Sequence, residues 1–287
     1  MSNGITERQN EDKYICHLGA QRQLYNEAKR FDNVELLFSV GIPLILAIIQ
    51  IAISDNIYLN TVSYLMSIVS MVLSIWISSL VKQTREKAAE IQQHFDTYVY
   101  QMPWDKKLFG QQNDVTHIVA EKSQLLFRQD GEREKLKNWY TILVENVNLE
   151  KGILMCQKEN YNWDVGLRRR FRCMSSIVIG ILAAGIFLIG IVKSESVSML
   201  ICRFAFITPM FQWLAQTIKQ LNEDIKNLKE LDTLLAPSES KSMDDLQEIQ
   251  GAIYMHRKSC FMIPNWFYKK YKNNDEDVAH RTALMNQ

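Results

Sequence analysis

Hydrophobic residues gather in four long runs, and the segments between them hold nearly all of the charge. The runs cover residues 34–54, 58–81, 174–192 and 197–218. A run of about 18 or more apolar residues can cross the hydrocarbon core of a bilayer as a helix. The pattern therefore predicts an all-α integral membrane protein, with four transmembrane helices in two hairpins at 34–81 and 174–218.

The polar segments carry the basic residues that orient such a protein. Segments 1–33, 82–173 and 219–287 hold five, sixteen and ten Lys or Arg residues, whereas the hairpin loops at 55–57 and 193–196 hold one. Positive charge stays on the cytoplasmic side of membrane proteins. We therefore expect the three polar segments to be cytosolic and to build one domain.

The cytosolic segments read as helices, because strand alternation and tight hairpin turns are absent. Residues 82–101, 148–172 and 219–235 each continue an apolar run without proline. Ser242, followed three residues later by Asp245, has the spacing of a capping box and predicts a helix over 243–259. The predicted cytosolic domain is thus helical, built from an N-terminal helix, a middle helical segment and C-terminal helices.

A polar stripe runs along the second apolar segment. Its residues recur every three or four positions, which places them on one face of a helix. Such a face can either pack closely against another helix or border a water-filled path, and the spacing is compatible with both. Under the second interpretation, the pore-lining candidates are Asn60, Ser63, Ser67, Ser70 and Ser74, with Gln212 from the fourth run.

Net charge and missing motifs argue against two classes of function, nucleic-acid binding and catalysis. A net charge of +1 argues against binding to a DNA or RNA duplex. The sequence has no phosphate-binding glycine loop, no metalloprotease motif and no nucleophile elbow, and its five cysteines show no metal-ligand spacing. We expect no enzymatic activity, no catalytic residue, no metal site and no cofactor.

Amide, aromatic and arginine side chains cluster just before the third apolar run, in residues 155–171 (MCQKENYNWDVGLRRRF). Guanidinium groups suit phosphates and aromatic faces suit bases, so this composition fits a nucleotide ligand. Arginines next to a membrane segment can equally be headgroup anchors. With similar clusters elsewhere, the ligand-binding candidates are Asn160, Trp163, Asp164, Arg168, Arg169, Arg22 and Arg257.

The chain resembles the prokaryotic four-transmembrane effectors associated with SMODS-type nucleotidyltransferases. Six stretches in order carry the resemblance: 20–30 (AQRQLYNEAKR), 95–105 (FDTYVYQMPWD), 138–147 (NWYTILVENV), 155–171, 249–258 (IQGAIYMHRK) and 263–272 (IPNWFYKKYK). The resemblance implies a CBASS-like antiphage effector of the bacterial inner membrane. A cyclic oligonucleotide from a paired nucleotidyltransferase would open a pore and cause cell death or growth arrest.

Two other functions remain open at this point. Four helices with one polar stripe cannot enclose a channel alone, so a pore requires a homo-oligomer in the lipid bilayer. The chain could instead be a non-conducting, membrane-anchored sensor or scaffold that recruits a cytosolic partner. A membrane-tethered enzyme with an unrecognised site is a third possibility.

Overall fold

The computed structural model describes residues 2–52, 57–192, 196–236 and 241–271, and these residues contain helices and connecting segments but no strand. The prediction of an all-α protein is therefore confirmed. In chain order the helices are α1 (Ile5–Gln9), α2 (Asp12–Leu36), the π-helix η1 (Leu37–Gly41), α3 (Ile42–Ala52), α4 (Ile57–Val99), α5 (Lys106–Phe109), α6 (Thr116–Phe127), the 3₁₀-helices η2 (Glu134–Leu136) and η3 (Ile142–Asn146), α7 (Leu149–Val192), α8 (Val197–Leu235) and α9 (Met243–Ser259).

The prediction of four transmembrane helices is contradicted. Across the residues that the structure describes, no stretch of helix is both long and apolar enough to cross a membrane. The first apolar run is not one helix but is divided among α2, η1 and α3. The other three runs are parts of α4, α7 and α8, which continue into polar sequence. Most of the two predicted hairpin loops, 55–57 and 193–196, lies outside the described residues, which leave out 53–56 and 193–195.

The chain divides into two compact units. Unit 1 comprises residues 1–28, 82–168 and 224–287, and unit 2 comprises residues 29–81 and 169–223. Each boundary falls inside a long helix (α2, α4, α7 or α8) and lies within five residues of a boundary expected from the charge pattern. Unit 1 therefore corresponds to the three polar segments, and unit 2 corresponds to the apolar ones.

Local sequence signals account for the helix ends in unit 1. Ser242 caps α9, since its hydroxyl accepts a hydrogen bond from the Asp245 N–H at 3.2 Å while the Asp245 carboxylate accepts one from the Ser242 N–H at 2.9 Å. The predicted capping box and helix over 243–259 are thus confirmed. At the end of α4, Gln101 adopts the left-handed conformation with φ 53°, and Pro103 follows. Both features stop a helix.

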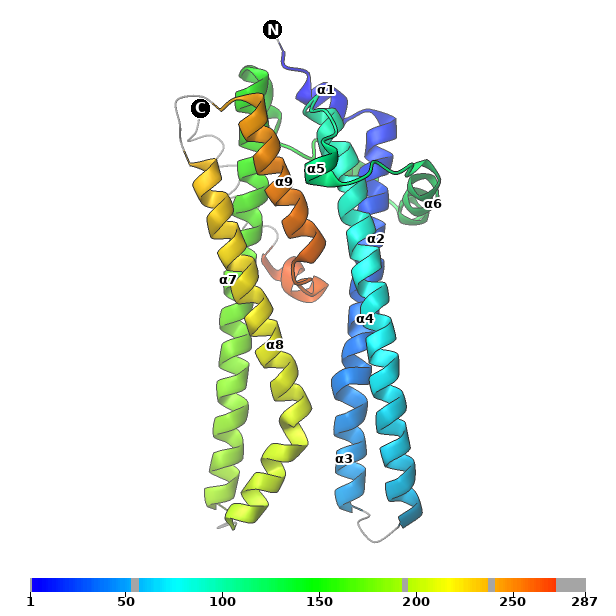
Figure 1. Cartoon of the computed structure of the whole chain (residues 1–287), viewed down its shortest axis with the longest axis vertical. Helices are drawn as coiled ribbons and strands as arrows, with labels where there is room; N and C mark the ends of the chain where they lie inside the picture. Colours follow the sequence, from blue (N-terminus) through cyan, green and yellow to red (C-terminus); the bar gives the residue numbers. More distant parts are fainter. Residues whose placement is uncertain (1, 53–56, 193–195, 237–240, 272–287) are drawn as a thin grey trace. The chain divides into compact units, whose positions relative to one another are not determined.

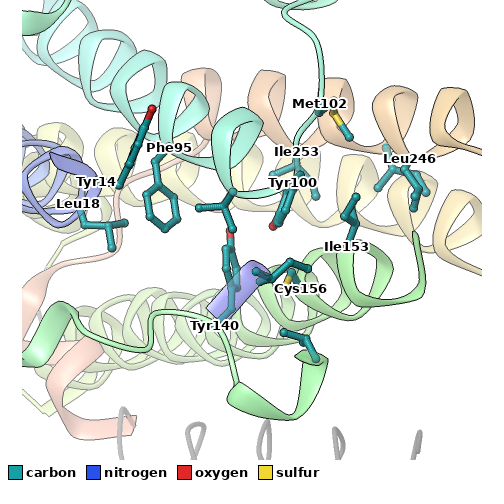
Figure 2. Close-up of a cluster of buried hydrophobic side chains, with 14 of the residues drawn as sticks. Tyr14, Leu18, Phe95, Tyr100, Met102, Tyr140, Ile153, Cys156, Leu246 and Ile253 are labelled. Carbon is teal, nitrogen blue, oxygen red and sulfur yellow. The ribbon is translucent and has the colours of Figure 1, made fainter. Parts of the chain in front are cut away.

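The core of unit 1 is built around aromatic residues (Figure 2). Phe95 of α4 and Tyr100, the residue after α4, are completely buried, and the centroid of the Tyr100 ring lies 5.7 Å from that of the Tyr140 ring. Ile153 and Cys156 of α7 complete this layer without any exposed surface. The core thereby fixes α4 relative to α7, the helix that carries five of the predicted ligand residues.

In unit 2, Pro43 explains the π-helix. The Ile42 N–H bonds back to the Leu37 carbonyl, five residues earlier, and Pro43 has no N–H to donate. Neither residue can therefore bond the Phe38 carbonyl. The Ser70 hydroxyl of α4 donates to that carbonyl at 2.6 Å instead. Figure 1 shows η1 and α3 beside α4.

Candidate functional site

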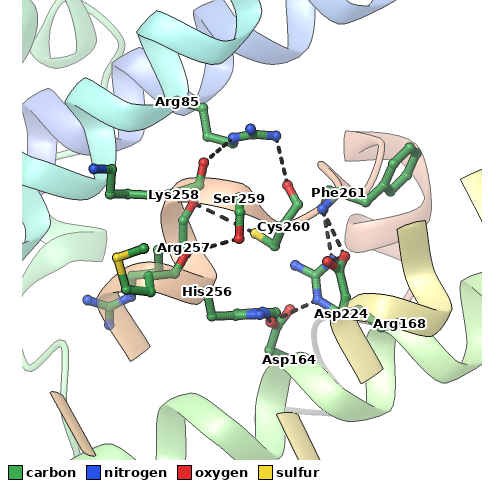
Figure 3. A network of polar contacts seen from close by, with 11 residues as sticks. Arg85, Asp164, Arg168, Asp224, His256, Arg257, Lys258, Ser259, Cys260 and Phe261 are labelled. Carbon is green, nitrogen blue, oxygen red and sulfur yellow. Dashed lines mark hydrogen bonds and ion pairs between the residues drawn. The ribbon is translucent and has the colours of Figure 1, made fainter. Parts of the chain in front are cut away.

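Arg168, near the middle of α7, is the centre of a buried ion-pair network in unit 1 (Figure 3). Only 3% of the residue is exposed. Its Nη1 donates to the Asp224 carboxylate of α8 at 2.6 Å and to the Phe261 carbonyl at 2.8 Å, and its Nε donates to Asp164 at 2.9 Å. Asp224 also accepts from the Phe261 N–H at 2.8 Å. Three of the five guanidinium N–H groups are thus bonded to protein oxygens.

Asp164 joins this network to α9. Its carboxylate is one helical turn from Arg168 and 2.5 Å from the Nε2 atom of His256. Burial alone would raise the pKa of Asp164, but the charge of Arg168 and the hydrogen bond with His256 outweigh it and hold that pKa well below its usual range. Asp164 is therefore ionised at any physiological pH and serves as a fixed negative charge.

A second buried pair lies nearby. Arg257 of α9 contacts the Asp96 carboxylate of α4, which is completely buried. The Tyr140 hydroxyl donates to the same carboxylate at 2.6 Å, and Asn160 donates to the Tyr140 oxygen at 3.2 Å. Burial lowers the pKa of Arg257, yet the charge of Asp96 more than offsets this and raises it. The Nη2 atom of Arg257 is buried and has no hydrogen-bond partner among the described residues.

The end of α9 and the two residues after it connect the neighbouring helices. Arg85 of α4 donates to the Lys258 carbonyl at 2.8 Å and to the Cys260 carbonyl at 3.0 Å. Together with the contacts of Phe261, these bonds connect residues 258–261 to α4, α7 and α8 (Figure 3). We refer to residues 258–261 as the strap. Its first two residues are the last two of α9, the other two have no regular structure, and charged side chains hold all four in position.

The structure brings four of the predicted ligand residues into this interior. Asp164, Arg168 and Arg257 are members of the two ion pairs, and Asn160 joins them through Tyr140. Each already contacts other protein groups, so an anionic ligand would compete with a carboxylate for either guanidinium. Their role in ligand binding stays a prediction.

The remaining predicted ligand residues lie elsewhere. Arg169 is exposed and belongs to unit 2, while Arg22 pairs with Glu132 at 3.5 Å. Trp163 is part of α7, but its side chain lies outside the described structure. Sequence reasoning missed Asp96 and Asp224, the two most buried carboxylates. The four-residue spacing of Asp164 and Arg168 is the one local signal that could have indicated an ion pair.

Two of the predicted pore-lining residues border a common cavity in unit 2. The cavity has a volume of about 370 Å³, and Ser74 of α4 and Gln212 of α8 both line it. Ser70 does not line it, because it is 2% exposed and bonds the Phe38 carbonyl. The side chains of Asn60, Ser63 and Ser67 lie outside the described structure. Where described, the serine stripe both packs and borders a cavity.

Sequence comparison places these features in a family. Residues 3–284 match the family described as the SMODS-associating 4TM effector domain. A protein of Bacillus cereus (strain VD146), described as "Probable CBASS effector molecule", is 24% identical over 291 residues, and the alignment covers 95% of each chain. No solved structure matches the chain. Because the match spans nearly the whole sequence, this chain belongs to the SMODS-associating 4TM effector domain family.

Proposed function

We propose that the chain is an antiphage CBASS effector that permeabilises the bacterial inner membrane when a cyclic oligonucleotide binds to it. Membership of an effector family associated with SMODS proteins supports the effector role, as does the description of the Bacillus relative. The activator would come from a paired nucleotidyltransferase. The effector carries out no catalytic step of its own and needs no cofactor.

The single observation that carries membrane action is the apolar surface of unit 2. Tyr58, Leu65, Val72 and Trp76 of α4 are between 56% and 81% exposed. Ile181, Leu188 and other apolar residues of α7 are exposed as well, and no charged residue interrupts either stretch. Contiguous apolar surface of this kind marks a contact with lipid or with another protein chain. We propose that lipid contacts this surface. Any aqueous path would then be enclosed by several copies of the chain in a homo-oligomer.

Ligand sensing would use the buried charges of unit 1. A cyclic oligonucleotide carries phosphates that compete with Asp96 and Asp224 for the guanidinium groups of Arg257 and Arg168. Displacing Asp224 would weaken the bonds that hold Phe261 in the strap, and displacing Asp96 would free Arg257, the residue before the strap. A ligand shifts a conformational equilibrium only by its difference in affinity for the two states. The proposed activated state is therefore the one in which the strap contacts are released.

Binding and permeabilisation can be tested separately. A thermal-shift screen of the purified full-length chain against cyclic di- and trinucleotides, with their linear counterparts as controls, detects binding through the rise in apparent stability. The same nucleotides are then added to dye-loaded liposomes that contain the protein. We expect one cyclic nucleotide to stabilise the protein and to release dye. A nucleotide that binds saturably without releasing dye would overturn permeabilisation, and no binding across the panel would overturn the nucleotide activator.

The second candidate function is a non-conducting sensor or scaffold that recruits a cytosolic partner. The hydrogen bonds of Ser70 and Ser74 favour it, since both hydroxyls connect α4 to its neighbour, at Phe38 and Glu35 respectively. A scaffold tolerates leucine at positions 67, 70 and 74 if the protein still folds, whereas a conducting pore lined by these serines does not. Dye release by the folded triple leucine variant therefore distinguishes the two functions.

A further inference from the structure

The unit 2 cavity contains a carboxylate in otherwise neutral surroundings. Glu35, in the last turn of α2, lines it together with Ser39, Ser74, Gln212 and apolar and aromatic side chains. Its carboxylate accepts a hydrogen bond from the Ser74 hydroxyl at 2.7 Å. No Lys or Arg among the described residues forms an ion pair with it. Placing a carboxylate in apolar surroundings without a cationic partner costs free energy unless another group compensates its charge.

The π-helix next to Glu35 shapes this cavity. Residues of η1, with Pro43 two positions after its end, form one wall. A π-turn is wider than an α-turn and occurs frequently at functional sites. The helix also places the Ser39 hydroxyl oxygen on the cavity, where it is buried and has no hydrogen-bond partner within the described residues. Glu35 and Ser39 thus supply a charge and a buried oxygen, neither of which is compensated by a protein cation.

Oxygen atoms from a separate helix complete the lining. Gln212 and Gln216 are one turn apart on α8, and both side chains border the cavity. Amide, hydroxyl and carboxylate oxygens are the ligands that hard cations prefer. Among the described lining residues, Glu35 is the one carboxylate. One negative charge with several neutral oxygens matches a monovalent cation better than a divalent one, because divalent sites draw on more carboxylates.

We propose that this cavity binds a monovalent inorganic cation, Na⁺ or K⁺, with Glu35 as its charge partner and with Ser39, Gln212 and Gln216 as neutral oxygen donors. Trp213 and Phe38 line the same cavity, and an aromatic face attracts a cation. The site extends the proposed function, because a cation site in the membrane-active unit would make any permeability selective for cations. Ion binding itself requires neither the nucleotide nor a pore.

The test is a thermal-unfolding titration of the purified full-length chain in detergent micelles, without nucleotide. NaCl or KCl replaces N-methyl-D-glucamine chloride at constant ionic strength, because that organic cation is too large for coordination by converging side-chain oxygens. We expect a saturable rise in Tm with Na⁺ or K⁺. In Glu35→Gln, the half-saturating concentration should increase at least tenfold. Glu223→Gln serves as the matched control, since Glu223 is exposed, belongs to unit 2 and does not line the cavity.

Two outcomes would overturn the proposal: equal stabilisation by N-methyl-D-glucamine, or an unchanged half-saturating concentration in Glu35→Gln. If Glu35→Gln fails to fold, Gln212→Leu decides, because Gln212 is an exposed residue of α8 that tolerates leucine. Unchanged binding in that variant would then refute the site. A failure of dye release leaves this titration unaffected, so the cation site and the permeabilising function fail independently.

Discussion

Replacing Arg168 by methionine tests whether the buried network holds unit 1 together. The substitution keeps an unbranched side chain but removes three hydrogen-bond donors from Asp164, Asp224 and the Phe261 carbonyl. The Asp224 side chain is 1% exposed, so it becomes a buried charge without a cation. Removing one partner of a buried ion pair typically costs about 3–5 kcal/mol. Asp164 contributes less to this loss, because it is 23% exposed and keeps His256.

A second substitution shows how much of the stability lost in Arg168→Met comes from the unpaired charge of Asp224. Replacing the pair together, as Arg168→Met with Asp224→Leu, leaves no uncompensated charge at either position. Buried pairs replaced by apolar residues are often neutral in stability, so the double variant should regain most of the lost free energy. The Phe261 N–H loses its acceptor in that variant, which should cost about 1 kcal/mol. The double variant is therefore expected to be more stable than the single one.

The assay is equilibrium unfolding in urea, followed by far-ultraviolet circular dichroism with the m-value compared among variants. Arg169→Met is the matched control, because Arg169 is the next residue in α7 and is exposed. We expect the control to change the free energy of unfolding by less than about 0.5 kcal/mol. If Arg168→Met were no more destabilising than Arg169→Met, or if the double variant were less stable than the single one, the network would not have the energetic role assigned to it.

Three further predictions concern single residues. Burial raises the pKa of Glu159 to about 7, against a hydrogen bond from the Thr141 N–H that lowers it. The folded protein then retains a proton that the unfolded chain releases near pH 4.5. The free energy of unfolding should therefore fall as the pH rises from about 4.5 to 7. Urea titrations at several pH values should show a flatter dependence in Glu159→Gln. Ser70→Ala leaves the Phe38 carbonyl without its donor and should lower the free energy of unfolding by about 1–3 kcal/mol, whereas Ala at the exposed Ser78 should have little effect. In thiol labelling of the native protein, the exposed Cys173 should react at once, and buried Cys156 should react only on unfolding.

Helix positions in unit 1 could be predicted from the sequence because their signals are local. The capping pair of Ser242 and Asp245 lies within one turn, and Pro103 indicates the end of α4. The sequence also predicts that the apolar runs continue as polar helices, since no proline interrupts residues 148–172. By contrast, the transmembrane prediction rested on the composition of each run alone. Composition does not show that the first run is divided at η1, where Pro43 changes the hydrogen-bond pattern.

Arg168 and Arg169 show why the candidate site could be predicted only in part. Both arginines precede the same apolar run, and composition is compatible with phosphate binding or headgroup anchoring for each. Adjacent residues on a helix point about 100° apart, so one faces the interior of unit 1 and the other faces solvent. The choice depends on Asp224, which lies 56 residues away and is brought close by the packing of α8. The four-residue spacing of Asp164 and Arg168 on one helix predicts the contact between these two residues. The contacts of Arg168 with Asp224 and Phe261 depend on tertiary packing. The structure, and not the residue types, therefore determines which arginine stays accessible to a ligand.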